Sequence, residues 1–424
     1  MRAGILGVTL TLALGMGNAI AADGAGPRNG ATDPAAPILP LDTVLRRVAD
    51  RNPELRMWEL KAQARSAQAE GGGAWMPPEV GIGAADLPYG MSMAPGDPAM
   101  MVSVRQMIPG LGKAGSRTGY LESRARGERA GGAWMRASLL ADAKSRYAAM
   151  AVADRRLAVL AEAESVMRYM LQVAEARFKN RQADLATVQE AKAKLEELGA
   201  MGVMERSARL EAASALRLLM ADTTLKEFSA DTSLVLRGYA DQPPESVLVS
   251  ARPDLEQAEA AIRSMELERE WMRRQARPDF GIQFDHMEMF DMGRRFSVMG
   301  MMTLPSAPWA SGMVRSETKG MALDIRSMRS DLEARRLMAL RMARETRLML
   351  RAESDLARRY ATGVVPAFRL ALDASMAAYQ EGSGDLFRVL DAWDRWVMAR
   401  MTAVEHLGKA SALEAEYERE TGKL

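Results

Sequence analysis

Cysteine is absent from this chain of 424 residues, and histidine occurs only twice. The chain therefore forms no disulfides, and it cannot carry a lipid on an N-terminal cysteine. Beyond the N-terminal segment, no window of about eighteen residues is continuously apolar, which excludes an ordinary membrane-spanning helix. The 57 basic and 55 acidic residues nearly cancel, so the concentrated positive face of a nucleic-acid-binding protein is not expected.

Catalytic motifs are also absent. The sequence has no glycine-rich phosphate loop, no nucleophile elbow and no cluster of His, Asp and Glu with the spacing of metal ligands. The two histidines, His286 and His406, lie far apart in the sequence and are interpreted as structural. We therefore expect a protein that is not an enzyme and that needs no cofactor.

The N-terminus has the pattern of a secretory signal peptide over residues 1–21. A positive residue is followed by a mostly apolar run, Ile5–Met16, and Ala19–Ala21 provides a cleavage site. Residues 22–40 are rich in Gly, Pro and Ala and are expected to be a flexible lead-in. The mature chain is thus predicted to be exported.

The most informative positive feature is a repeat after about two hundred residues. Three pairs of segments carry it: Asn52-Pro53-Glu54-Leu55 and Arg252-Pro253-Asp254-Leu255, Pro78 and Pro278 before β-like stretches, and 178–185 and 379–386. So long a period indicates a duplicated half rather than a solenoid. The predicted units are a first repeat, an inter-repeat linker, and a second repeat with a C-terminal tail: 41–235, 236–251 and 252–424.

Both halves carry apolar heptads, which are typical of long packed helices. The seam of the first half is Met150, Ala153, Leu157, Leu160, Glu164, Met167, Leu171, Ala174 and Phe178. The seam of the second half is Leu386, Leu390, Trp393, Val397, Arg400, Val404 and Leu407. A helix of about sixty residues would be roughly 90 Å long and must pack along its whole length. Helical hairpins and several chains are therefore predicted.

Strand-like alternation occurs in four stretches: 79–88, 100–108, 280–290 and 294–304. In the third stretch Phe280, Ile282 and Phe284 share one face, whereas glycines blur the faces of the first pair. Alternation over about ten residues is typical of outer-membrane strands, although an ordinary half-buried hairpin would also show it. Four strands cannot close a barrel, so several chains must contribute if the strands span a membrane.

The chain resembles the TolC-like outer-membrane efflux factors from about Leu41 to Gly408. The resemblance rests on the N-P-x-L start and its R-P-D-L echo, and on three further segments: Pro109-Gly110-Leu111-Gly112-Lys113, 379–384 and Val389-Leu390-Asp391-Ala392. It implies a mainly α fold with a small β part. Duplicated long helical hairpins would form a periplasmic tunnel, and four strands per chain would contribute to a trimeric, twelve-stranded outer-membrane β-barrel.

The same resemblance implies a passive duct in a tripartite exporter. Its partners would be further copies in a homotrimer, a periplasmic adaptor, an inner-membrane efflux pump of the RND type and outer-membrane lipid, but no nucleic acid. The adaptor would dock at the hairpin tips, which here are Asn180, Arg181, Gln182, Gly382, Ser383 and Gly384. Asn180 stands where glycine is favoured, and Asn tolerates the left-handed region. The rival interpretation is a periplasmic coiled-coil adaptor or scaffold, which would carry a single hairpin.

Members of this family narrow the tunnel near the tips with a D-V-L-D pattern. Here Arg388 replaces the first acid and Asp391 keeps the second, and Tyr379 is expected to belong to the same gate. Three copies of Asp391 around an axis would form a negative ring that favours cations. The alternative is that Arg388 and Asp391 are solvated charges beside Leu390.

Methionine occurs 33 times. Many methionines fall at helix seams, where they fill irregular gaps. Four others, Met287, Met289, Met299 and Met301, are expected on the less apolar faces of the second strand pair. Thioethers are soft ligands that favour Cu(I) and, by the same softness, Ag(I), so transient contacts with such heavy-metal cargo are predicted. Export of small organic toxicants, with methionines that only pack, is the alternative.

Overall fold

The structure is a computed structural model, which describes residues 37–85, 99–180, 184–233, 244–289 and 293–423. The predicted signal peptide and nearly all of the predicted lead-in lie outside the described residues. Pro37 onwards belongs to one unit. Its elements in the first half are α1 (Leu41–Arg51), α2 (Pro53–Glu70), a short 3₁₀ turn (Gly71–Gly73), β1 (Glu79–Ala85), β2 (Ala99–Ile108), α3 (Lys113–Lys179) and α4 (Leu185–Leu219).

The second half repeats this order. It comprises α5 (Glu245–Val249), α6 (Pro253–Gln275), β3 (Phe280–Met289), β4 (Gly293–Met302), α7 (Gly312–Arg359), a π-helical turn (Tyr360–Val364), α8 (Val365–Gln380) and α9 (Leu386–Glu420). The return helices α4 and α9 have the same length, 35 residues each. The predicted fold of duplicated helical hairpins with a small β part is confirmed.

The duplication extends to equivalent contacts at the start of α2 and α6. Each helix begins with a proline, which needs no hydrogen-bond acceptor for its nitrogen at this position. Before α2, the Asn52 side chain donates to the backbone oxygen of Leu219 at the end of α4, at 3.0 Å. Before α6, the Arg252 guanidinium donates to the carboxylate of Glu420 at the end of α9. Each half is thus closed by a side chain that joins its first long helix to its return helix.

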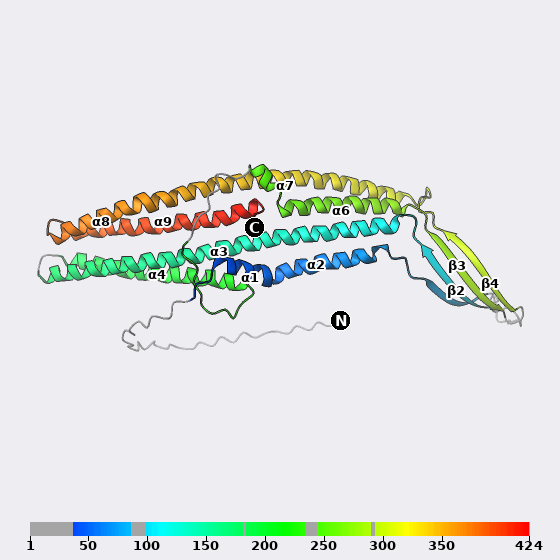
Figure 1. Cartoon of the computed structure of the whole chain (residues 1–424), viewed down its shortest axis with the longest axis horizontal. Helices are drawn as coiled ribbons and strands as arrows, with labels where there is room; N and C mark the ends of the chain where they lie inside the picture. The colour runs from blue at the N-terminus through cyan, green and yellow to red at the C-terminus, as the bar shows by residue number, and fades with distance from the viewer. Residues whose placement is uncertain (1–36, 86–98, 181–183, 234–243, 290–292, 424) are drawn as a thin grey trace, which may run out of the picture. The chain divides into compact units, whose positions relative to one another are not determined.

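The helix α3 is the longest element, with 67 residues and no proline. It packs on α2 and α6 over one part of its length and on α4 and α9 over the other, as Figure 1 shows. The π-helical turn separates α7 from α8 and lies shortly before Pro366, near the start of α8. Because proline lacks an N–H and crowds the preceding turn, the change of hydrogen-bonding pattern at this point is expected.

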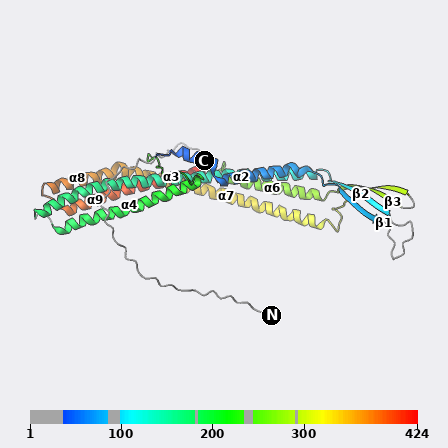
Figure 2. The ribbon, with the colours of Figure 1, turned by 90° about the horizontal axis from the view of Figure 1, so that it is seen from below.

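The four strands form one antiparallel sheet in the order β1-β2-β3-β4, so its central pair joins the two halves (Figure 2). In the register, Phe284 of β3 lies opposite Val104 of β2 and Val298 of β4. The strand predicted to end at Leu304 ends at Met302, which lies opposite Phe280, the first residue of β3. Residues 290–292, between β3 and β4, lie outside the described residues.

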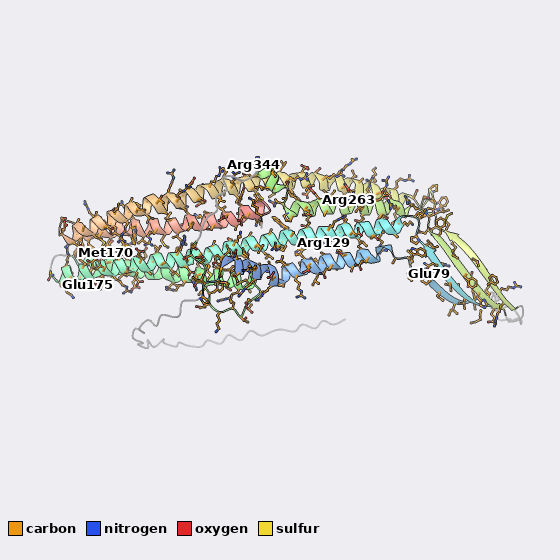
Figure 3. All side chains as sticks on the ribbon, viewed as in Figure 1. Glu79, Arg129, Met170, Glu175, Arg263 and Arg344 are labelled. Atoms are coloured by element: carbon orange, nitrogen blue, oxygen red, sulfur yellow. The ribbon has the colours of Figure 1, made fainter. Side chains whose placement is uncertain are left out.

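The core near the hairpin tips is formed by α3, α4, α8 and α9. It buries Met167, Trp393 and Trp396 together with Met170, which Figure 3 labels on α3. The indole of Trp393 donates to the backbone oxygen of Ala163 at 3.3 Å. The predicted seam of α3 is buried at most positions, but Phe178 is 41% exposed, because it lies at the end of α3 where the return helix has not yet begun.

Among the residues that the structure describes, no helix combines the length and the apolar composition that crossing a membrane requires.

Candidate functional site

One face of the sheet is apolar and exposed. Its large side chains have exposed fractions between 39% and 76% in the single chain: Val80, Ile82, Val102, Val104, Phe280, Ile282, Phe284, Phe296, Val298 and Met302. The rings of Phe284 and Phe296 stack with centroids 6.2 Å apart. Val104 pairs with both Val80 and Phe284, so Val80 and Val104 lie on the same face as Phe284. The sequence alone did not show which residues of the first strand pair lie on this face. An exposed apolar surface of this size is typical of a face that contacts a membrane or another protein.

The opposite face is polar, and its groups satisfy one another across the strands. Arg105 on β2 contacts Glu79 on β1 at 3.3 Å and donates to Gln283 on β3 at 2.9 Å. Gln283 donates in turn to Asp285 at 2.7 Å, and Ser297 on β4 donates to Asp285 at 3.0 Å. Glu79 opens β1 at the helical end of the sheet (Figure 3). A row of hydrogen bonds thus crosses all four strands on the face turned away from the apolar surface.

The described methionines of the predicted set lie on this polar face. The register places Met287 opposite Arg295, and it places Met299 and Met301 opposite Gln283 and Gly281. The backbone of Met289 pairs with Gly293, and its side chain lies outside the described residues. The pairing therefore gathers the described members of the predicted set on one face.

Two more methionines of this face were missed by the sequence analysis. Met101 is the cross-strand partner of Met287, and Met107 is the partner of Gly281. The glycines of β1 hid the alternation of the first pair, so only the pairing of β2 with β3 could reveal them.

The second hairpin tip needs glycine at two positions, for different reasons. Gly382 has a φ of +81°, in the left-handed region that side chains rarely adopt. Gly384 has ordinary torsions, but a Cβ there would lie 2.9 Å from the backbone nitrogen of Tyr379. Between them, the Ser383 hydroxyl donates to the carbonyl of Ala378 at 3.1 Å. The turn between α8 and α9 is therefore closely packed.

The first tip differs from expectation. Asn180, where glycine was expected to be favoured, is exposed and has a φ of −87°, outside the left-handed region. Its amide N–H continues the helical pattern by donating to the carbonyl oxygen of Ala176 at 3.3 Å. Arg181 and Gln182, the other predicted docking residues of this tip, lie outside the described residues.

Contacts between the two hairpins surround Tyr379. Tyr379 is 7% exposed, and its hydroxyl is buried without a partner among the described residues. The Arg177 guanidinium lies 4.1 Å from the ring centre and donates to the backbone oxygen of Gln380 at 3.1 Å. The Gln380 amide donates to the Tyr169 hydroxyl at 3.1 Å. These contacts join the end of α3 to the end of α8.

The junction between sheet and helices uses residues from both halves. The segment after β2 turns through Gly112, whose φ is +80°. Buried Lys113 forms an ion pair of 2.7 Å with Asp279, and the same carboxylate accepts the N–H of Gly110 at 2.7 Å. Arg274 donates to the backbone oxygen of Gly112 at 3.0 Å. The start of α3 is thereby fixed against the segment that leads into β3.

Comparison with known proteins agrees with this geometry. Residues 44–222 match the model of the family described as outer membrane efflux protein. Three similar solved structures are the OprN outer-membrane channel (TM-score 0.77, 15% identity, 91% of this chain and 90% of that chain), CusC (0.77, 14%, 90% and 91%) and VceC from Vibrio cholerae (0.74, 16%, 90% and 96%). No curated protein sequence matches the chain.

The resemblance to the TolC-like outer-membrane efflux factors is confirmed. Residues 44–222 are thus similar to the outer membrane efflux proteins, and nearly the whole chain shares the fold of outer-membrane channels, which are transport channels rather than enzymes. Identities of 14% to 16% show the fold and do not identify the cargo.

The predicted gate residues differ in their exposure within one chain. Tyr379 is buried between the hairpins on α8, whereas Arg388 and Asp391 are exposed on α9. Asp391 forms an exposed ion pair of 2.9 Å with Arg395, one helical turn further on. Arg395 was not among the predicted site residues, although spacing by four residues on a helix could have indicated the pair.

The histidines have different surroundings. His286 lies on the apolar face of β3, opposite Val102 and Phe296. The Nδ1 atom of His406 lies 2.6 Å from a carboxylate oxygen of Glu353, and its ring packs on Tyr360. Within the described part of the chain, no three His, Asp or Glu side chains are grouped as ligands for a metal ion.

Proposed function

We propose that three copies of this chain form a passive duct that exports soft metal cations, such as Cu(I) or Ag(I), from the periplasm to the outside. The trimer is supported above all by the sheet, which has one exposed apolar face and one hydrogen-bonded polar face. A lipid-facing strand surface is apolar, and the lumen side is polar. With four strands per chain, three chains would supply twelve.

The edges of the sheet support assembly. β1 and β4 are the outer strands, and each has one edge without a partner strand in the described chain. Backbone groups left unpaired in lipid cost several kcal/mol each, so an open four-stranded sheet is unstable there. Pairing β4 of one chain with β1 of the next satisfies both edges and closes a barrel.

The helices need neighbours as well. Helix α4 packs on α3, whereas α7 packs on α6 and α9. Both carry exposed apolar side chains: Val203, Met204 and Leu218 on α4, and Leu337, Met338 and Leu348 on α7. Packing between chains would bury these residues and continue the barrel as a tunnel. The residues predicted as the linker, 236–251, would then lie at the tunnel's middle, between repeats 41–235 and 252–424.

The duct has no energy source of its own in this proposal. A periplasmic adaptor would dock at the tips, and an inner-membrane pump of the RND type would supply energy and substrate. The tight turn around Gly382 presents a defined surface for an adaptor. The alternative of a periplasmic adaptor or scaffold is less well supported, because the chain has two hairpins that each follow a strand pair.

The cargo proposal rests on the methionines of the polar face. Met287, Met299 and Met301, with Met289 on the same strand, would be repeated in three chains around one lumen. Weak, repeated thioether contacts suit conduction, which needs sites that release as readily as they bind. The exposed Asp391 of three chains would add a negative ring near the tips, partly offset by Arg388 and Arg395.

The test compares cells with and without the gene. Deletion should lower tolerance to copper and silver, and a variant with Leu at Met287, Met289, Met299 and Met301 should restore it incompletely at equal outer-membrane level. Leu preserves volume and apolarity, so folding should change little. If cells without the gene became sensitive to organic toxicants but not to metals, the cargo would be small organic molecules instead of metal cations. Recovery of the wild type as a soluble periplasmic monomer would contradict the duct itself.

A further inference from the structure

Two of the seven tryptophans are exposed, and all seven lie among the described residues. Trp75 is 58% exposed and Trp309 is 89% exposed. The other five are buried or partly buried within helices: Trp58, Trp134, Trp271, Trp393 and Trp396. Tryptophan is a large apolar side chain that is usually well buried, so the two exposed indoles indicate a surface that is covered in the assembled protein.

Both exposed tryptophans lie in segments that join an outer strand of the sheet to a helix. Trp75 precedes β1, and Trp309 follows β4. The segment before β1 is held by the Gln106 side chain, which donates to the backbone oxygen of Met76 at 3.0 Å. The segment after β4 is held by the backbone N–H of Thr303, which donates to the start of the β3 segment at 2.9 Å. The two indoles therefore flank the helical end of the sheet (Figure 1).

The exposed apolar surface of the sheet continues into these segments. At the helical end of the apolar face, Phe280 and Met302 lie opposite each other, and both are exposed. Beyond the strands, Met76, Leu111 and Leu304 are exposed as well. Apolar side chains thus extend the face that the proposed barrel turns to lipid as far as the two indoles.

Positive charge accompanies the apolar side chains at this level. Exposed Arg117 lies near the start of α3 and lines a cavity of about 380 Å³ together with Met76. Exposed Arg315 lies in the first turn of α7 and donates to a neutral group, the Ser311 hydroxyl, at 2.9 Å. Tryptophan near arginine is typical of the boundary between bilayer and water, where the indole reaches both media and the guanidinium attracts lipid phosphates. This composition fits a layer of phospholipid headgroups.

Closure of the barrel brings the indoles of different copies together. β1 and β4 are the outer strands, and antiparallel pairing of β4 with β1 of the next copy places the end of β4 beside the start of β1. Within one chain, three strand spacings, about 14 Å, separate the segments that carry Trp309 and Trp75. Across the seam between copies, one spacing of about 5 Å separates them. The two indoles are therefore neighbours between copies rather than within one chain.

We propose that Trp309 of one copy and Trp75 of the next form a composite anchor at each seam of the trimer, with both indoles in the phospholipid headgroup layer at the periplasmic boundary of the membrane. The anchor fixes the depth of the barrel and covers the seam where the paired strands end. The inference rests on the proposed trimer in the outer membrane and is independent of the proposed cargo.

The first test measures quenching of tryptophan fluorescence by brominated phospholipids in vesicles that contain the purified full-length protein. Bromine near the headgroup end of the acyl chain should quench the wild type more than bromine near the chain terminus, because the indoles lie at the interface. Trp75→Phe with Trp309→Phe keeps two aromatic rings and should lose most of this quenching. If the double variant does not insert, the two single variants decide in the same way.

The matched control is Trp58→Phe with Trp134→Phe, which removes two partly buried indoles of the helical part. Trp134 lies about 30 Å along α3 from its first residue, so quenching should be unchanged. Flotation with the vesicles separates the possible failures. A wild type that does not float would contradict the proposed membrane channel. A wild type that floats but is not quenched, or a double variant quenched as strongly as the wild type, would overturn the anchor alone.

The absence of cysteine allows a second test, which addresses the seam. Trp75→Cys with Trp309→Cys, treated in vesicles with a short bifunctional thiol reagent, should yield covalent trimers on denaturing gels, because each copy is linked to the next. Trp309→Cys alone should yield monomers, since its three thiols lie at different seams. Monomers from an inserted double variant would show that the two positions do not meet between copies and would overturn the composite anchor.

Discussion

The guanidinium of Arg177 donates a hydrogen bond of 3.1 Å to the backbone carbonyl of Gln380. The bond joins the last turn of α3 to the last turn of α8, which belong to different halves of the duplicated chain. The same guanidinium lies over the Tyr379 ring, and Gln380 reaches back to Tyr169. The two hairpins are therefore tied together at the tip end, where the resemblance predicts the gate.

Removing this tie should open the tunnel. Arg177→Ala deletes one charge-assisted hydrogen bond and one cation–π contact, together worth roughly 1–2 kcal/mol, or a 5- to 30-fold change in the population of the open state. The expected result is a larger conductance or a higher open probability of the purified protein in planar lipid bilayers.

The control for this prediction is Arg168→Ala, on the same helix. Arg168 pairs with Glu164 on its own helix and is exposed, so its loss should leave conductance unchanged. Equal conductance of wild type and Arg177→Ala would show that the contact does not restrain the gate.

The two faces of β4 allow a sharp test of membrane orientation. Val298 and Met299 are neighbours in sequence, exposed by 66% and 50%, and they point to opposite faces of the sheet. Val298→Lys would place a charge in lipid at a cost of about 2–4 kcal/mol near the midplane, whereas Met299→Lys would face the lumen. Only Val298→Lys should reduce the amount of heat-modifiable trimer in outer-membrane fractions. Equal loss in both variants would contradict the assigned faces.

Much of the fold was readable from the sequence, because its signals are local and repeated. Proline at the start of α2 and α6 and the long stretches without proline are backbone effects that tertiary contacts rarely override. The faces of β3 were also readable, since Phe280, Ile282 and Phe284 alternate with polar or small residues. The structural similarity to efflux channels confirms the fold inferred in this way.

The remaining features depend on contacts between distant segments. Gly81 and Gly83 carry no side chains to reveal which face of β1 is apolar, so only the register with β2 shows it. The contact between Arg177 and Gln380 has no signature in either local sequence. Asn180 tolerates the torsions of a glycine turn, but whether it adopts them is decided by the backbone around it, and helical hydrogen bonding continues to this residue.

The glycines of the second tip should differ in the substitutions they tolerate. Gly382→Val is strained by the positive φ, and Gly382→Asn should be milder because Asn enters the left-handed region more readily. At Gly384, even Ala should be harmful, since its Cβ would meet the backbone of Tyr379 and Ala378. Export of a reporter cargo should fall slightly in Gly382→Asn and further in Gly382→Val. Gly384→Ala should also impair export, while the trimer level in the outer membrane stays normal in all three variants.

Gly199→Ala in α4 is the control for the tip substitutions. A Cβ at Gly199 meets nothing within 4 Å, and Ala favours a helix more than Gly does, so export should be unchanged. Loss of the trimer in the Gly382 variants would show that this turn is needed for assembly rather than for docking.

The contact between Glu245 of α5 and Arg347 of α7 predicts a dependence of stability on pH. The hydrogen bond from Arg347 lowers the pKa of the Glu245 carboxyl below its ordinary value of about 4.5, against a smaller opposing effect of burial. A carboxyl whose pKa is lower in the folded state stabilises the fold above its unfolded pKa. This stabilisation should therefore be complete above about pH 5 and should be lost as the pH falls through the lower, folded pKa.

Glu245→Gln removes the charge while keeping the size of the side chain. Its thermal unfolding temperature, followed by circular dichroism in detergent, should lie below that of the wild type at about pH 7, and the difference should shrink progressively below about pH 4.5. Asp142→Asn is the control, because Asp142 forms an exposed pair with Arg146 on one helix and should shift the curve little at any pH. A difference between wild type and Glu245→Gln that persists unchanged into acid would mean that the carboxylate charge does not stabilise the contact between α5 and α7.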